Sequence, residues 1–136
     1  MATIEIKYLG DLRVESTHVQ SGQKLLTDAP LDNKGKGEAF SPTDLLATAL
    51  ATCMVTVMGI AAREHHIDME GITCSVIKIM ASDPRRVSQV HVSFGFPNGQ
   101  KYTEKEKVIL ERSARTCPVA KSVHPELIQD IVFNFV

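Results

Sequence analysis

No charged residue occurs between Leu45 and Ala62, and this uncharged run constrains the fold more than any other feature. Its length approaches the ~20 residues that a membrane-spanning helix needs. The run is rich in Ala and Thr rather than Leu, however, and no aromatic belt flanks it. We therefore expect no membrane span, but a helix that is apolar on all sides and lies at the centre of a protein core or a subunit interface.

Local signals define where this helix begins and ends. Ser41 can cap the helix, Pro42 suits its first position, and Asp44 can reach back as a capping-box acid does. We expect the helix to continue to about His65. Spacings of three and four residues put five apolar positions on one face, namely Leu46, Leu50, Cys53, Val57 and Ile60. Cys53 should therefore point with the apolar stripe.

Strand and turn signals lie on both sides of this helix. Alternating residues predict a three-strand meander at 4–8, 12–17 and 24–28, followed by a loop at 29–40. After the helix, the patterns predict a strand at 71–81, a second strand through 90–96, helices through 103–115 and from 118, and a final strand at 131–135. This order is α+β rather than regular βαβ, and we expect residues 1–136 to form a single domain. Because a long apolar helix is hard to bury in so small a chain, a dimer that wraps a partner around it is the natural solution.

Composition excludes several classes of function. The 15 Lys and Arg nearly balance the 16 Asp and Glu, which argues against a basic nucleic-acid face or a polybasic membrane anchor. The first residues alternate like a strand and lack the apolar core of a signal peptide. Three cysteines without a C-x-x-C pair do not make a disulfide framework. We expect a cytoplasmic protein, in which a disulfide would be transient and functional.

Cys117 lies directly before Pro118 and gives the clearest local signal for a reactive thiol. If Pro118 is the first helical residue, the N–H groups of the next turn point towards the sulfur, and the helix dipole favours the thiolate. Arg112, Arg115 and Lys121 add positive charge nearby in the sequence. The alternative is a thiol that merely precedes a proline.

Cys53 has two interpretations of similar weight. It can be a small hydrophobic residue of a core helix, as free cysteines often are. It can also be a nucleophile in an apolar pocket, where a neighbouring stripe of threonines, Thr48, Thr52 and Thr56, could donate hydrogen bonds to a thiolate or a bound oxygen substrate. Cys74 lies in a predicted strand, and we interpret it as a packing residue.

Motifs for cofactors and metals are missing from the sequence. No two Cys or His residues have a close ligand spacing such as C-x₂-C or H-x₃-H. The stretch Gly35-Lys36-Gly37 lacks the strand-to-helix context of a phosphate loop. We expect neither a metal nor an organic cofactor.

Two segments resemble the signature motifs of one known family. The segment Ser41 to Cys53, SPTDLLATALATC, resembles the central-helix motif of the OsmC/Ohr family, and CPVAK from Cys117 to Lys121 resembles its second cysteine motif. The separation of the two cysteines and the order of meander, helix, hairpin, helix also match, so the resemblance spans nearly the whole chain.

The resemblance implies a fold and an activity. It implies an intertwined homodimer, with two long helices buried at the centre and two active sites at the subunit interface. It also implies a thiol peroxidase for oxidative-stress defence, in which Cys53 attacks an organic hydroperoxide or H2O2 and becomes a sulfenic acid. Cys117 would then condense with that sulfenic acid to a disulfide, and an external dithiol would restore both thiols.

The chain departs from the organic-hydroperoxide branch of the family at one position. That branch carries Glu directly after the helix-entry proline, where it works with an Arg of the N-terminal sheet, whereas this chain has Thr43. Asp44 is one residue later, about 100° further round the helix, and Arg13 is the only Arg of the meander. Arg13 and Asp44 are the candidates for this pair, and the chain resembles a general OsmC-like branch.

Two other functions stay open on the same scaffold. Because Thr43 replaces the Glu of the organic-hydroperoxide branch, the chain could be a non-enzymatic binding protein. Its interface pocket would then hold a small apolar or thiol-containing ligand. The third possibility is a redox sensor or structural dimer, in which a disulfide changes partner binding but is recycled slowly.

Overall fold

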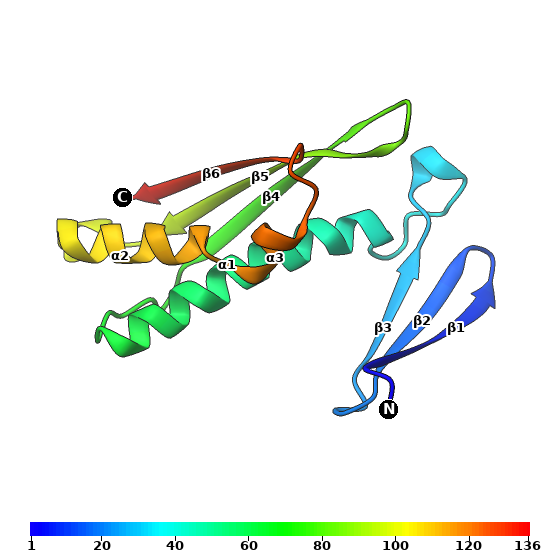
Figure 1. The fold of residues 1–136 in the computed structure, drawn as a ribbon, viewed down its shortest axis with the longest axis horizontal. Helices are drawn as coiled ribbons and strands as arrows, with labels where there is room; N and C mark the ends of the chain where they lie inside the picture. The colour runs from blue at the N-terminus through cyan, green and yellow to red at the C-terminus, as the bar shows by residue number, and fades with distance from the viewer. The chain divides into compact units, whose positions relative to one another are not determined.

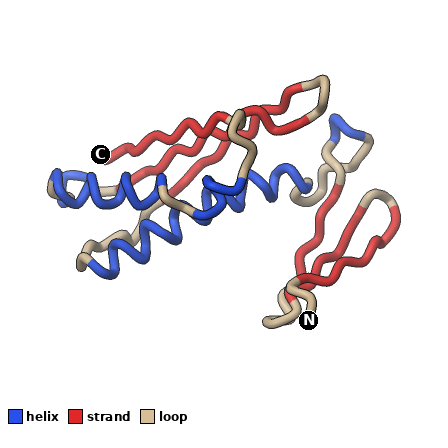
Figure 2. Tube along the Cα trace, in the orientation of Figure 1, coloured by secondary structure: helices blue, strands red, loops and turns tan.

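A computed structural model describes all residues from Met1 to Val136 (Figures 1 and 2). The chain divides into two compact units, Met1–Leu46 and Ala47–Val136, and the border falls inside helix α1 (Pro42–Glu64). Strands come first, then the long helix, a hairpin, two further helices and a last strand. The predicted α+β class and order of elements are confirmed.

The first unit contains a three-stranded antiparallel sheet. Strands β1 (Ile4–Gly10), β2 (Arg13–His18) and β3 (Lys24–Asp28) pair in sequence order, which confirms the predicted meander. The β1–β2 turn needs a left-handed backbone, and Gly10 supplies one such residue with φ of 90°. After β3, the loop contains one short 3₁₀ helix, η1 (Leu31–Asn33).

One face of this sheet is apolar and remains exposed. Ile4, Ile6 and Tyr8 alternate along β1 with exposed fractions of 53%, 69% and 63%. In the register of the sheet, Ile6 lies opposite Ser16, which in turn lies opposite Leu25, itself 41% exposed. A meander normally buries one face, so this face lacks the layer that usually covers it.

The second unit is built on a mixed sheet with the order β4-β5-β6. Strands β4 (Thr73–Ala81) and β5 (Arg86–Phe96) form the predicted antiparallel hairpin, and β6 (Ile128–Phe135) pairs with β5 in parallel. Parallel pairing requires a crossover. Helices η2 (Gly99–Lys101), α2 (Glu104–Arg115) and α3 (Pro118–Ser122) provide it. The last strand begins three residues before the predicted start because Ile128 is already paired with Gln89.

The core of this unit lies between the sheet and the helices, which all lie on one side of the sheet (Figure 1). Alternate residues of β5 point inward and are fully or almost fully buried: Val90, Val92, Phe94 and Phe96. Phe96 stacks on Phe135 of β6 with ring centroids 4.2 Å apart. Each such buried side chain contributes about 1.5–3 kcal/mol to folding, so the sheet and α1 form one stable layer pair.

Helix α1 is long and apolar enough to cross a membrane by length and composition, with a mean hydropathy of 2.1. Its inner side chains Leu50, Met54 and Met58 are nevertheless buried in the core cluster with the strands. In this structure α1 therefore packs as the core helix of a folded unit, as the sequence predicted.

Candidate active site

The start of α1 is fixed by reciprocal caps. The Ser41 N–H donates to Asp44 Oδ2 at 3.0 Å, and the Asp44 N–H donates to Ser41 Oγ at 3.1 Å. Pro42 is the first helical residue, where a missing N–H costs nothing. The predicted helix start is confirmed, and the Asp44 carboxylate takes part in the cap.

The buried side of α1 does not coincide with the face that carries Cys53. The buried residues are Ala47, Leu50, Ala51, Met54, Met58 and Ala62. Of the predicted stripe only Leu50 is among them, while Leu46 and Ile60 are 38% and 54% exposed. Because the run is apolar on every side, its sequence alone cannot identify the side that the sheet covers. Cys53 lies at the edge of the core, half-buried and packed against it.

Cys117 is the N-cap of α3, as its place before Pro118 predicted. Its backbone is extended, with φ of −62° and ψ of 141°, and its Sγ accepts a hydrogen bond from the Ala120 N–H at 3.2 Å. The side chain is completely buried. The N-terminus of α3 therefore holds the Cys117 sulfur buried against the core, with a hydrogen bond from the backbone.

The two sulfurs are neighbours in the second unit. Burial raises the pKa of the Cys117 thiol, and a hydrogen bond and charge interaction with the Cys53 thiol raise it further. The N–H groups of Ala120 and Val119 act in the opposite direction but are outweighed. The structure thus places two free thiols, one from α1 and one from the N-cap of α3, close enough to interact.

The balance of these effects corrects one expectation for Cys117. The helix N-terminus was expected to favour its thiolate, yet the net shift of its pKa is upward, because burial is the largest influence. The nearby cations do not offset it. Arg115, for example, lies over the Phe133 ring at 5.7 Å rather than at the sulfur. Cys117 is therefore held as a neutral thiol.

Threonine hydroxyls on α1 form hydrogen bonds within their own helix. The hydroxyls of Thr52 and Thr56 donate to the carbonyls of Thr48 and Thr52, both at 2.8 Å, within their own helix. All three threonines line a separate cavity of about 460 Å³ against β4. The hydroxyls of Thr52 and Thr56 are therefore engaged within the helix and do not donate to the Cys53 sulfur in this structure.

Cys74 lines that same cavity together with Val76. It is exposed rather than packed, which corrects the interpretation of this residue as a core side chain. Partial burial nevertheless raises the pKa of the Cys74 thiol. Cys74 pairs with Phe94 across the hairpin, so it lies on the helical side of the sheet and faces the cavity rather than the packed core.

Arg13 of β2 pairs with two carboxylates of the first unit, and Asp44 is not one of them. It is hydrogen-bonded and ion-paired with Glu38, and its Nη2 lies 3.6 Å from Asp28 Oδ2. Glu38 is the main reason why the pKa of Arg13 is raised. The Asp28 side chain is buried, and its Oδ2 accepts the Glu38 N–H at 3.1 Å.

Sequence reasoning missed both acidic partners of Arg13. Asp28 could have been found, because it lies directly opposite Arg13 in the β2–β3 register. Glu38 carries no such signal, since it comes from the irregular loop before α1. Oδ1 of Asp28 and Nε of Arg13 are buried without a hydrogen-bond partner. The cluster of Arg13, Asp28 and Glu38 therefore leaves two polar atoms unpaired.

No group of three or more His, Cys, Asp and Glu side chains is arranged to hold a metal ion. The candidate chemistry consequently rests on the two sulfurs of the second unit and on the arginine cluster of the first.

Comparison with known proteins assigns the family. The family model described as OsmC-like protein matches residues 35–129, so the chain belongs to the OsmC-like family. No curated protein matches. A candidate osmotic stress induced and detoxification response protein of Psychrobacter arcticus 273-4 is 52% identical, with a TM-score of 0.93 over 98% of this chain and 96% of that one.

More distant solved structures share the fold. The organic hydroperoxide resistance protein OsmC of Legionella pneumophila is 17% identical, with a TM-score of 0.75 over 98% of both chains. A candidate organic hydroperoxide resistance protein of Vibrio cholerae, with captopril in one of its active sites, is 14% identical, with a TM-score of 0.74 over 100% of this chain and 94% of that one. These likenesses confirm the OsmC-like fold that the sequence resemblance implied.

Proposed function

We propose that this chain is a thiol-dependent peroxidase that reduces organic hydroperoxides or H2O2 in oxidative-stress defence. The single observation that carries the proposal is the pair of free thiols, Cys53 and Cys117, that two separate helices bring together. Membership of a family that includes organic hydroperoxide resistance proteins supports the substrate class.

The burial of the two thiols supports the order of attack. Cys53 is half-buried at the edge of the core, so a peroxide can reach it from outside. Cys117 is fully buried and its pKa is raised, so it is the poorer nucleophile towards an outside substrate. Cys53 is therefore the proposed peroxidatic residue, and Cys117 the resolving one.

The proposed cycle balances as follows. The Cys53 thiolate attacks one peroxide oxygen, the O–O bond breaks, and the leaving alkoxide takes a proton to give an alcohol, or water when H2O2 is the substrate. The resulting sulfenic acid condenses with the Cys117 thiol, which releases water and forms the disulfide. An external dithiol then reduces that disulfide by two exchange steps and is itself oxidised.

Arg13 and Asp44 remain proposed residues of the same reaction, and the structure suggests how their parts differ. Asp44 is engaged in the cap of α1, which favours a structural part for this acid. Glu38 and Asp28 form ion pairs with Arg13. They can therefore replace the Glu that this chain lacks at position 43. We propose that Arg13 stabilises the thiolate, with Glu38 fixing its guanidinium group.

A homodimer in the cytoplasm is part of this proposal. The exposed apolar face of Ile4, Ile6 and Tyr8 and the exposed Ile60 of α1 are surfaces that a second copy would bury. A reducing compartment would keep the three cysteines free between turnovers.

Stopped-flow measurements with cumene hydroperoxide and H2O2, each with a dithiol donor, test the proposal. We expect Cys53→Ser to abolish peroxide consumption and Cys117→Ser to allow one turnover without efficient recycling. Cys74→Ser is the matched control and should retain activity. Full activity in Cys53→Ser would exclude the assigned nucleophile.

A non-enzymatic binder is the second candidate function. The absence of an acid at Thr43 favours it, and the Vibrio cholerae relative shows that an active site on this fold accepts captopril. This candidate predicts an ordinary Cys53 thiol and no turnover with any peroxide. A redox sensor would instead form the disulfide, change its partner binding and recycle slowly, which pull-downs from oxidised and reduced extracts would detect.

A further inference from the structure

A cavity of about 490 Å³ lies at one end of the second unit, apart from both sulfurs of the proposed active site. Its walls come from the β4–β5 turn, the start of β5 and the loop before β6. The volume is in the range of about 300–1,000 Å³ that is typical of small-molecule pockets. Neither Cys53 nor Cys117 lines it, so peroxide chemistry does not explain it.

Arg86 provides a fixed positive charge in this cavity. Its Nη1 donates to the Ser82 carbonyl at 3.1 Å and to the Pro84 carbonyl at 2.8 Å, both within its own turn. These two bonds hold the guanidinium group in place but neutralise none of its charge. No carboxylate lies within ion-pair distance of Arg86, so its remaining N–H groups are available for an anion.

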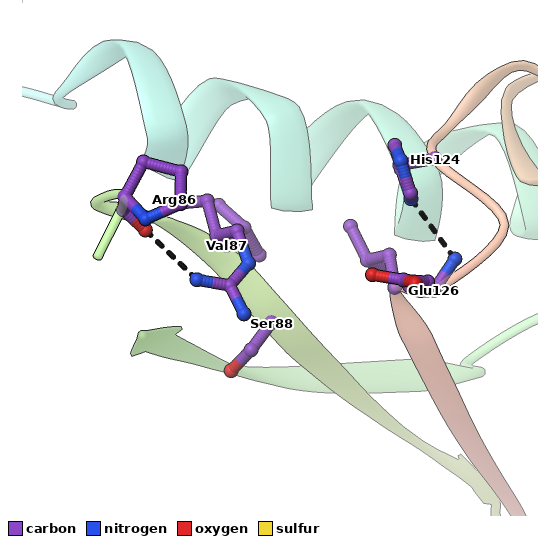
Figure 3. Close-up of a pocket in the computed structure, with 7 residues that line it drawn as sticks. Arg86, Val87, Ser88, His124 and Glu126 are labelled. Carbon is purple, nitrogen blue, oxygen red and sulfur yellow. Dashed lines mark hydrogen bonds between the residues drawn. The ribbon is translucent and has the colours of Figure 1, made fainter. Parts of the chain in front are cut away.

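His124 adds a second donor on the opposite wall. Its Nδ1 accepts the Glu126 N–H at 3.0 Å, which leaves Nε2 as the ring nitrogen that can donate to a ligand. Figure 3 shows Arg86 on one side of the cavity and His124 with Glu126 on the other. A carboxylate between these walls could accept from both Arg86 and His124.

Glu126 gives the same cavity an unpaired negative charge. Its backbone N–H is used by His124, but its carboxylate has no ion-pair partner in the structure. A purely anionic ligand would meet repulsion from this group, whereas a ligand that also carries an ammonium group would pair with it. The remaining walls are apolar and come from Pro84, Val87 and Leu127.

We propose that this cavity is a binding site for a small zwitterion, namely a free α-amino acid with an aliphatic side chain. The ligand carboxylate would bind Arg86 and His124, its ammonium group would bind Glu126, and its side chain would contact Val87 and Leu127. Opposite charges on both sides of one cavity discriminate against simple acids and simple amines, which carry only one of the two groups.

Calorimetric and NMR titration of the full chain with L-leucine tests this site without any peroxide. Two analogues isolate the charges: 4-methylpentanoate lacks the ammonium group, and 3-methylbutylamine lacks the carboxylate. We expect saturable leucine binding with a Kd of about 1 mM, and each analogue to bind at least about fivefold more weakly. Absence of saturable leucine binding, or equal binding of 4-methylpentanoate, would overturn the proposal.

Variants connect the binding to the named residues. Arg86→Gln and Glu126→Gln should each weaken leucine binding by about fivefold or more, because each removes one ion pair of the ligand. Arg85→Gln is the matched control, since this neighbouring arginine does not line the cavity. Arg86 also anchors its turn, so the nearly isosteric Glu126→Gln variant keeps the test decisive if Arg86→Gln misfolds. Unchanged leucine binding in Glu126→Gln would contradict the assignment.

Discussion

Oxidation that joins Cys53 to Cys117 should stabilise the folded chain measurably. The bond would close a loop of about 64 residues, and a loop of that length removes about 4 kcal/mol of chain entropy from the unfolded state. Strain in the native state reduces this value, so we expect a gain of about 2–4 kcal/mol. At about 2 kcal/mol per molar urea, the unfolding midpoint should rise by about 1–2 M.

Urea unfolding followed by circular dichroism measures this gain. The reduced chain and the peroxide-oxidised, desalted chain are compared at one protein concentration, because dimerisation makes stability depend on concentration. Cys53→Ser should lose the shift on oxidation, whereas Cys74→Ser should keep it. If the oxidised chain carries the bond but unfolds at the same urea concentration as the reduced chain, or at a lower one, the two sulfurs are not neighbours in an undistorted native fold.

Three further predictions follow from individual interactions. Because the pKa of Cys117 is raised in the folded state, the free energy of unfolding should fall as pH rises from the ordinary thiol pKa towards the raised one, and Cys117→Ser should lose part of this dependence in urea titrations at several pH values. Thr103→Ala should cost about 1 kcal/mol in urea unfolding, because Thr103 Oγ1 accepts the Glu106 N–H at 3.1 Å in the capping box of α2. Glu38→Gln should lower the rate of peroxide reduction about tenfold or more in stopped-flow assays, because it weakens the group that fixes Arg13.

Each of these predictions has a control and a contradicting result. If the free energy of unfolding of Cys117→Ser falls with rising pH as much as that of the wild type, the first prediction is contradicted. Thr3→Ala changes an exposed threonine outside any cap, and an equal cost at Thr3 and Thr103 would contradict the second. Glu5→Gln alters an acid of the same unit that does not pair with Arg13, and wild-type rates in Glu38→Gln would exclude a positioning part for Glu38.

Local rules made much of the fold predictable. The capping pairs Ser41–Asp44 and Thr103–Glu106 and the N-cap at Cys117 depend only on residues within three positions of one another, and all three are present. Strands with strict alternation, such as β5, were found for the same reason. Local sequence decides these features because their hydrogen bonds close within a single turn.

Features that depend on tertiary packing were not predictable in the same way. The buried side of α1 could not be identified in a helix that is apolar all round, so the burial of Met54 and the exposure of Ile60 follow only from the packed structure. Burial also reversed the expected direction for the pKa of Cys117, although the local cap was correct. The Glu38 partner of Arg13 lies 25 residues away in an irregular loop, where no periodicity points to it.

Peptide mapping after peroxide treatment tests the central claim most directly. The folded chain is treated with one equivalent of cumene hydroperoxide, remaining thiols are alkylated, and the digest is analysed by mass spectrometry. We predict one dominant cross-linked species that joins Cys53 to Cys117 of the same chain, with Cys74 fully alkylated. Consumption of the peroxide with Cys53 and Cys117 both recovered as alkylated thiols, or a bridge through Cys74 instead, would contradict the account.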